Sequence, residues 1–234
     1  MSTVHRGTAF EERSLALLRD QFSMTLTRVG GRDDGGIDLI GWWWLPSIKG
    51  SSGSEATALQ TATGEQRRRI RVVAQCKAEK KKMGPNYVRE LEGVVYRLRH
   101  GDTNLFSVDP KVQAEGAETL PVALLISQSP FTKSTILRAH SSPIPFFLLH
   151  LPPEAPSSPS SQEPASGVTF PTKDETIGAA VWNPALAGSS GLLQGQMEVR
   201  WERNSTTGSS QPRLWWQGNT LKNWTPAGPT VSNA

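Results

Sequence analysis

The chain of 234 residues carries 25 Lys and Arg against 21 Asp and Glu, and the net charge of +4 is compatible with a nucleic-acid partner without requiring one. Its single cysteine excludes an internal disulfide and a cysteine-based zinc cluster, and fits a reducing compartment. No apolar run approaches the ~20 residues of a membrane-spanning helix, so we expect no membrane span.

The first expected element is an amphipathic helix that includes Phe10 to Phe22, where apolar residues recur at helical spacing. Thr8 can cap this helix, and Glu11, three residues later, can complete a capping box. The alternating run from Met24 to Val29 predicts a strand.

Two short motifs at strand ends organise the rest of the chain. The first is Asp34-Gly35-Gly36-Ile37-Asp38, at the start of a strand-like run from Gly36 to Trp44. The second is Gln75-Cys76-Lys77, at the end of a run from Ile70 to Lys77. Asp34 is most simply a turn residue, whereas Asp38, inside an apolar strand, is costly unless it is paired or bound to a ligand.

The spacing of these motifs predicts a polar site. Side chains alternate along a strand, so Gln75 and Lys77 share one face and Cys76 points to the other. If the two strands pair, the Asp38 carboxylate and the Gln75 amide oxygen meet beside the Lys77 ammonium. Oxygen ligands suit Mg2+, and a neighbouring lysine can act on a water or on negative charge developing on phosphate. This combination of side chains is typical of a metal-dependent phosphodiesterase.

Two of the three segments between and after the motifs have two interpretations. Trp42-Trp43-Trp44 is more simply one or two core residues plus an anchor than a platform for stacked bases. The Gly/Ser/Thr/Ala-rich segment from Pro46 to Gln66 predicts a hairpin insertion. The run Lys80-Lys81-Lys82 is placed for phosphate contact beside the second motif, although such runs are often only solvated loops.

The second half of the core continues the alternation of helices and strands. Gly84-Pro85 opens a helix with an apolar stripe, and its first turn carries Tyr87 and Arg89, where free N–H groups favour phosphate. Buried strands are predicted over Val122 to Ile126 and Pro143 to Leu151, with a short helix through Leu137 between them. The order helix, three strands, helix, strand, helix, strand is typical of an α/β fold.

The composition changes after residue 151. Residues 152–167 hold five prolines and many serines, which predicts a linker. In residues 168–234, alternation predicts two strands, Met197 to Glu202 and Arg213 to Gln217, amid five tryptophans. With so few aliphatic residues, we expect this Trp-rich β appendage to pack its tryptophans on the core of residues 1–151 rather than to fold alone.

Taken in order, these pieces resemble the PD-(D/E)XK nuclease signature and, more narrowly, the Mrr-type restriction endonucleases, whose second motif is Gln-x-Lys. The chain is also similar to a fungal mitochondrial family named for being required for respiratory growth, which shares this core and a Trp-rich tail. The resemblance covers about two-thirds of the chain and is carried by Gly7 to Glu11, Gly30 to Asp38, Gln75 to Lys77, Val88 to Gly93, Ala123 to Ser127, Phe131-Thr132 and Ile144 to Leu149.

The resemblance implies a restriction-endonuclease-like core and a Mg2+-dependent DNA endonuclease in mitochondria, with mitochondrial DNA maintenance as one role. Asp38, the Gln75 oxygen and the Cys76 carbonyl would hold the metal. Lys77 would act on water or on developing charge, with Glu11 in support. Gln75 is neutral where many relatives carry an acid, which lowers the expected metal affinity. The residues expected to contact DNA are Arg32, Lys80, Lys81, Lys82, Tyr87 and Arg89.

Other functions fit the same residues. One is an exonuclease or junction resolvase on this fold. Another is a non-catalytic nucleic-acid-binding or assembly protein needed for respiratory function, although the presence of both Asp38 and Lys77 favours the enzyme. The oligomeric state stays open, with a homodimer as one option. Residues 1–10 are too short for a transit peptide, so we expect no ordinary targeting signal.

Overall fold

The computed structural model describes residues 3–29, 36–48, 59–60, 65–100, 120–153, 176–203 and 210–226. Its helices are α1 (Thr3–Phe22), α2 (Asn86–Arg99), α4 (Lys133–His140) and α5 (Pro184–Ala187). Its strands are β1 (Met24–Arg28), β2 (Leu39–Pro46), β3 (Leu59–Gln60), β4 (Gln66–Lys77), β5 (Val122–Ser127), β6 (Phe146–His150), β7 (Ala179–Trp182), β8 (Met197–Arg203), β9 (Ser210–Trp216) and β10 (Asn219–Thr220).

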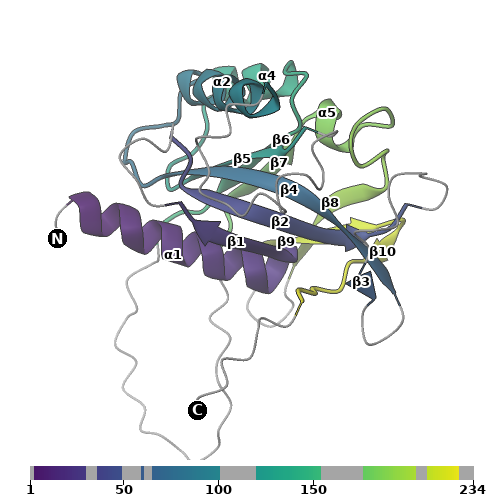
Figure 1. Ribbon diagram of the computed structural model, residues 1–234. Helices are drawn as coiled ribbons and strands as arrows, with labels where there is room; N and C mark the ends of the chain where they lie inside the picture. Colours follow the sequence, from purple (N-terminus) through teal and green to yellow (C-terminus); the bar gives the residue numbers. More distant parts are fainter. Residues whose placement is uncertain are drawn as a thin grey trace, which may run out of the picture.

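The main sheet lies between two helical layers, with α1 on one face and α2 and α4 on the other (Figure 1). Its strand order is β1-β2-β4-β5-β6-β7, and β3 pairs with β4. The strands β1, β2 and β4 are antiparallel, whereas β4, β5 and β6 are parallel. The described elements follow the expected order of a helix, three strands, helix, strand, helix and strand, with the two-residue β3 added between β2 and β4, and the mixed α/β class is confirmed.

Strand alternation divides the core into two clusters. Leu39, Val72 and Ala74 belong to the cluster on the α1 face, which also contains Phe10 and Leu17 of α1. The cluster on the opposite face includes Ile40, Val73 and Leu125 together with Val88, Leu91 and Val95 of α2. The central strands are thus buried on both sides, which explains their nearly continuous apolar sequence.

The first helix begins five residues before Thr8, so the expected capping box of Thr8 and Glu11 is wrong. A tertiary contact supports the added turn, because Arg6 Nη2 donates to the Ala78 carbonyl at 2.6 Å. Both residues of the expected box meet Arg28 of β1 instead. Arg28 Nε donates to Glu11 Oε2 at 2.7 Å, and Arg28 Nη2 lies 3.5 Å from Thr8 Oγ1.

The tryptophan triplet of β2 is structural, as expected. Trp43 is fully buried and stacks on Phe147 with 6.0 Å between the ring centroids. Trp44 packs edge-on against Trp224, and its Nε1 donates to Thr25 Oγ1 at 2.7 Å. Trp42 is half-buried beneath the guanidinium of Arg69, 4.4 Å from the ring centroid.

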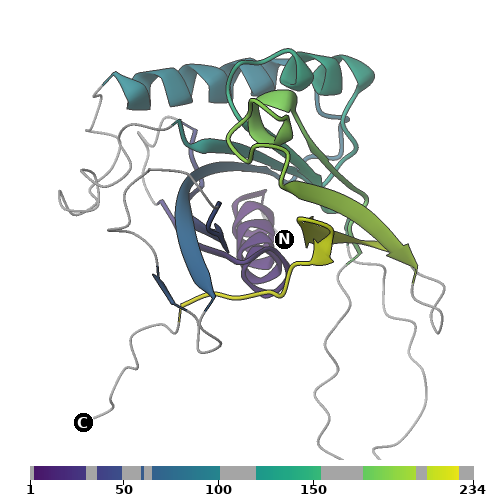
Figure 2. The same cartoon turned by 90° about the vertical axis from the view of Figure 1, so that its right-hand side faces the viewer.

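The C-terminal part contributes to the main sheet as well as forming its own. β7 pairs antiparallel with β6, while β8, β9 and β10 form a three-stranded sheet (Figure 2). Trp182 of β7 packs on Phe147, and Trp216 is buried in the α1-side cluster. The expectation is wrong for Trp201, which is 46% exposed, and for Trp215, because a sheet packed on one side leaves alternate residues outside.

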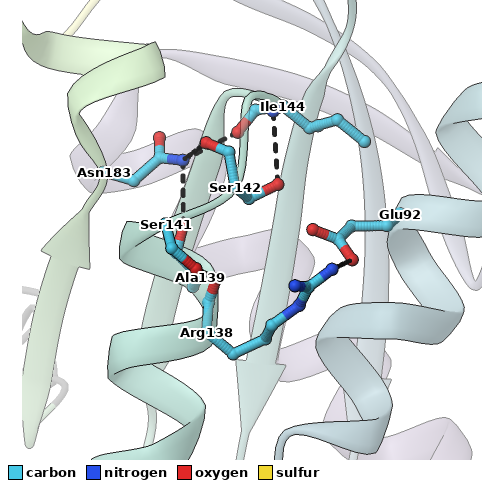
Figure 3. Close-up of polar contacts among 7 residues, drawn as sticks. All are labelled: Glu92, Arg138, Ala139, Ser141, Ser142, Ile144 and Asn183. Carbon is cyan, nitrogen blue, oxygen red and sulfur yellow. Dashed lines mark hydrogen bonds and ion pairs between the residues drawn. The ribbon is translucent and has the colours of Figure 1, made fainter.

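A buried asparagine joins this part to the core. Asn183 Oδ1 accepts from the N–H groups of Phe146 and Leu186 at 2.9 and 3.0 Å. Its Nδ2 lies 3.0, 3.1 and 2.7 Å from the carbonyl oxygens of Ala139, Ser142 and Ile144, at the turn between α4 and β6 (Figure 3). The same view shows Arg138 of α4 paired with Glu92 of α2.

The last described segment crosses back to the first helix. Asn223 Oδ1 accepts from the Ser23 N–H at 2.7 Å, and the Trp224 N–H donates to Ser23 Oγ at 3.0 Å. Buried Arg67 donates to the Lys222 carbonyl at 3.2 Å. Residues 222–224 therefore fasten the end of α1 to the start of β4.

Several expectations fall on residues outside the described ranges. They concern most of the insertion at 46–66, nearly all of the linker at 152–167, and the residues Arg32 and Asp34. The described part of the insertion includes β3, which pairs with β4. Among the helices of the described ranges, none combines the length and apolar character that a membrane crossing requires.

Candidate active site

The two motifs meet where the pairing of β2 with β4 ends. Asp38 precedes β2, and its N–H donates to the Ala74 carbonyl at 2.9 Å. Its Oδ2 accepts from the Cys76 N–H at 2.6 Å. Because the N–H and C=O of one strand residue lie on the same edge, the Cys76 carbonyl also faces the Asp38 side of β4. Asp38 and the Cys76 peptide are thus together.

Gln75 adds a buried oxygen to this corner. Its side chain is 3% exposed, and its Oε1 is buried with no hydrogen-bond partner in the described part of the chain. Gly36 lies beside it with φ +85°, and a Cβ there would come within 3.1 Å of Gln75 Nε2. Glycine therefore suits this turn both for its backbone and for the space that it leaves. A buried polar atom left unsatisfied costs about 1–3 kcal/mol and calls for an explanation such as a ligand.

Lys77 lies on the same face of β4, beside the first turn of α2. Its Nζ is 5.4 Å from the centroid of the Tyr87 ring. The Tyr87 hydroxyl in turn donates to the Glu79 carboxylate, 2.9 Å from Oε1 and 3.0 Å from Oε2. Burial, and then the bond to Glu79, raise the pKa of Tyr87, so the phenol keeps its proton at neutral pH.

The Cys76 side chain points away from this group, toward the α1 face. Burial raises the pKa of its thiol well above the ordinary value, and the Asp38 charge adds to the rise. The thiol is therefore neutral and is a poor nucleophile. Glu11 also contributes to the rise, which places its charge near Cys76, although its carboxylate is paired with Arg28.

A basic loop borders the site. Lys80, Lys81 and Lys82 are exposed between β4 and α2. The loop is held at both ends, because Ser129 Oγ donates to the Glu79 carbonyl at 2.5 Å and the Met83 N–H donates to the Pro130 carbonyl at 3.1 Å. Arg89, also exposed, follows in the first turn of α2, whose N-cap residue offers no side-chain cap.

The donor atoms fit a hard cation. No group of three or more His, Cys, Asp and Glu gathers among the residues that the structure describes. The corner instead offers one carboxylate, one amide oxygen and one backbone carbonyl, and such oxygen ligands suit Mg2+. The unpartnered Gln75 Oε1 is the observation that favours a cation at this corner.

The sequence did not single out Glu79 and Ser129. The spacing of Lys77 and Glu79, two residues apart at the end of β4, is a signal that could have placed both on one face. Ser129 carries no such signal, because it reaches Glu79 only through the packing of β5 against β4.

Comparison with known proteins gives a family match. The model of the family described as "Required for respiratory growth protein 7" matches residues 2–166. The Schizosaccharomyces pombe protein named "Uncharacterized protein C824.03c, mitochondrial" is 37% identical over 92 residues, which cover 39% of this chain and 30% of that protein. The alignment thus spans less than a third of that relative. No solved structure matches the chain. The mitochondrial location expected from the sequence is confirmed by these findings.

Proposed function

The chain belongs to the "Required for respiratory growth protein 7" family, and from this premise we propose that it is a Mg2+-dependent deoxyribonuclease with a PD-(D/E)XK core of the Mrr type. The observation that carries the proposal is the buried, unpartnered Gln75 Oε1 at the corner formed by Asp38 and the Cys76 peptide. These are the positions where the motif resemblance expects metal ligands.

Asp38, Gln75 Oε1 and the Cys76 carbonyl would hold the ion. When bound, Mg2+ supplies positive charge that stabilises the negative charge building on a phosphodiester during hydrolysis. The Cys76 N–H fixes the direction of the Asp38 carboxylate before any ligand arrives. Such preorganisation lowers the cost of binding.

Lys77 is the residue of this chain that would meet the reacting phosphate. Its ammonium lies on the same face of β4 as Gln75 and can donate to the developing charge or hold the attacking water. Lys80, Lys81, Lys82 and Arg89 surround the site with exposed cations. They would bind neighbouring phosphates of DNA without reading its sequence.

One observation favours a second function, that of a non-catalytic nucleic-acid-binding or assembly protein on this scaffold. Asp38 is the one acid among the expected metal ligands, and one of its oxygens already accepts from Cys76. A site with a single acid binds Mg2+ weakly. The basic loop would then serve DNA binding alone.

The experiment is cleavage of supercoiled plasmid and linear duplex by the full chain, with Mg2+ and with EDTA. Asp38→Asn and Lys77→Met should each lower the rate by about 10²-fold or more, because the first weakens the hold on the ion and the second removes a charge that acts on the reacting phosphate. Asp20→Asn, an exposed acid paired with Arg19, is the matched control.

Each outcome separates the candidates. Nicking of the plasmid circle requires an endonuclease, whereas degradation of the linear duplex alone indicates an exonuclease. Salt-dependent DNA binding without cleavage by the wild type supports the non-catalytic function. Circular dichroism of both variants checks that the fold is retained.

A further inference from the structure

We propose that Tyr87 is a positioning residue, whose ring holds the Lys77 ammonium at the site while Glu79 holds the Tyr87 hydroxyl. The inference rests on the proposed function and deepens it. It gives Tyr87 a role within the protein in place of a contact with DNA.

The contacts form a chain from the core to the lysine. Ser129 Oγ donates to the Glu79 carbonyl at 2.5 Å, which fixes the backbone just after β4. The Glu79 carboxylate receives the Tyr87 hydroxyl with both oxygens, at 2.9 and 3.0 Å. The ring so fixed lies 5.4 Å from Lys77 Nζ. Each member thus limits the freedom of the next.

The ring can orient the lysine because an ammonium is attracted to the face of an aromatic ring within about 6 Å. A free lysine side chain has several rotatable bonds, so it loses rotamer entropy when it is fixed to act on one atom. A ring that restricts the ammonium beforehand reduces this loss at the moment of reaction. This is a contribution to turnover rather than to the binding of DNA.

The same contacts make Tyr87 a poor ligand for phosphate. The single hydroxyl proton is already donated to Glu79, and phosphate oxygens need a donor. The Glu79 carboxylate beside the hydroxyl would also repel a phosphate. Lys80, Lys81 and Lys82, in the loop before α2, are exposed cations that attract phosphate.

The first test needs no catalysis. In protein with isotope-labelled lysine, the side-chain protons of Lys77 should show an upfield ring-current shift in the nuclear magnetic resonance spectrum, assigned through Lys77→Arg. The shift should persist in Tyr87→Phe, which keeps the ring, and vanish in Tyr87→Leu. Tyr96→Leu changes the exposed tyrosine of the same helix and is the matched control.

The second test separates turnover from binding. Tyr87→Leu should lower kcat about tenfold, as expected for loss of a cation–π contact at a functional site, and leave KM and the Kd for DNA unchanged. Tyr87→Phe should lower kcat about two- to threefold, because the ring stays but its tie to Glu79 is lost. Tyr96→Leu should match the wild type.

The outcomes distinguish the inference from the proposed function. A raised KM and Kd with unchanged kcat in Tyr87→Leu would make Tyr87 a DNA contact and overturn the inference alone. An active wild type without the ring-current shift, or an undiminished kcat in Tyr87→Leu, would do the same. A wild type that shows the shift but cleaves no DNA overturns the proposed function, and with it the role of the contact in turnover.

Discussion

The Asp38 carboxylate accepts a 2.6 Å hydrogen bond from the Cys76 N–H and so joins two sequence motifs that lie 38 residues apart. This bond positions the acid without help from a ligand. Gln75, one residue before Cys76 on β4, has a side-chain Oε1 that is buried without a partner among the described residues. The protein therefore supplies a hydrogen-bond donor to the Asp38 oxygen, whereas the described residues supply none to the Gln75 oxygen.

We predict that Gln75→Met keeps or raises the stability of the metal-free protein and abolishes its response to Mg2+. Methionine fills a similar volume without a buried unsatisfied oxygen, and relief of about 1 kcal/mol would raise the Tm by roughly 2–4 °C. Thermal melts with and without Mg2+ measure both effects. A Mg2+-dependent rise of Tm in the variant equal to that of the wild type would contradict the assignment of Gln75 as a ligand.

Replacement of Lys80, Lys81 and Lys82 by Ala should weaken DNA binding equally for all sequences. Each lost phosphate contact should reduce the slope of log K against log salt by about 0.9. Fluorescence anisotropy at several salt concentrations gives this slope. The triple variant of Arg200, Arg203 and Arg213 to Ala removes the same charge from the small sheet and should leave the slope unchanged. Equal slopes for both triple variants and the wild type would mean that the loop is only solvated.

Asn183→Ala should destabilise the fold by roughly 3 kcal/mol or more, because it removes the side-chain partner of the buried Phe146 N–H and of the Ser142 and Ile144 carbonyls. Chemical denaturation measures the loss. Asn219→Ala removes an exposed side chain that donates to the Gln217 carbonyl, and it should change the free energy of unfolding by less than about 0.5 kcal/mol. A similar loss of unfolding free energy in the two variants would contradict the role of Asn183 in joining this part to the core.

Truncation after Leu151 should cause aggregation and lower the Tm. It removes β7, and β6 then becomes an open edge with the apolar run Phe146 to Leu149.

Point variants distinguish buried from exposed tryptophans of this part. Trp216→Ala should lower the free energy of unfolding by about 3–5 kcal/mol, whereas Trp201→Ala should lower it far less. Light scattering and thermal melts report these effects. A soluble truncated chain with the Tm of the full chain would show that β7 and the small sheet serve a partner instead.

Acid should destabilise the protein partly through His150. Burial lowers the pKa of this imidazole, against which Gly178 packs. A lowered folded-state pKa means that the unfolded chain binds the proton first, so stability is lost as the pH falls below about 6.5. His150→Gln should therefore show a smaller drop in Tm between pH 7.5 and 5.5 than the wild type. His140→Gln, which changes an exposed histidine of α4, is the comparison variant. A drop in His150→Gln as large as that of the wild type would contradict the prediction.

Local pattern predicted most of the core. The strands β1, β2, β4, β5 and β6 and helix α2 follow from runs of apolar residues with clear period, and the alternation of Gln75, Cys76 and Lys77 correctly placed the thiol on the opposite face. Pattern could not find β7, a run of four residues that forms a strand through tertiary pairing with β6. Nor could it find Asn183, because a polar residue is buried only when distant backbone groups receive it.

The contact of Tyr87 with Lys77 and Glu79 could not be predicted from the sequence for the same reason. It depends on where the start of α2 lies against the end of β4, which packing decides and local spacing does not. The early start of α1 is similar, because Arg6 finds its acceptor 72 residues later in the chain.

The tie between Ser23 and residues 223–224 makes the first helix and the last described segment one mechanical unit. A force that pulls α1 away from the sheet would load the hydrogen bonds to Asn223 and Trp224 at the same moment. Ser23 also holds a left-handed backbone, with φ 57°, a conformation that persists where surrounding contacts enforce it. When the chain is extended from the α1 side, the force therefore acts on these hydrogen bonds first. Once they break, the strain at Ser23 is released and both segments can separate from the sheet together.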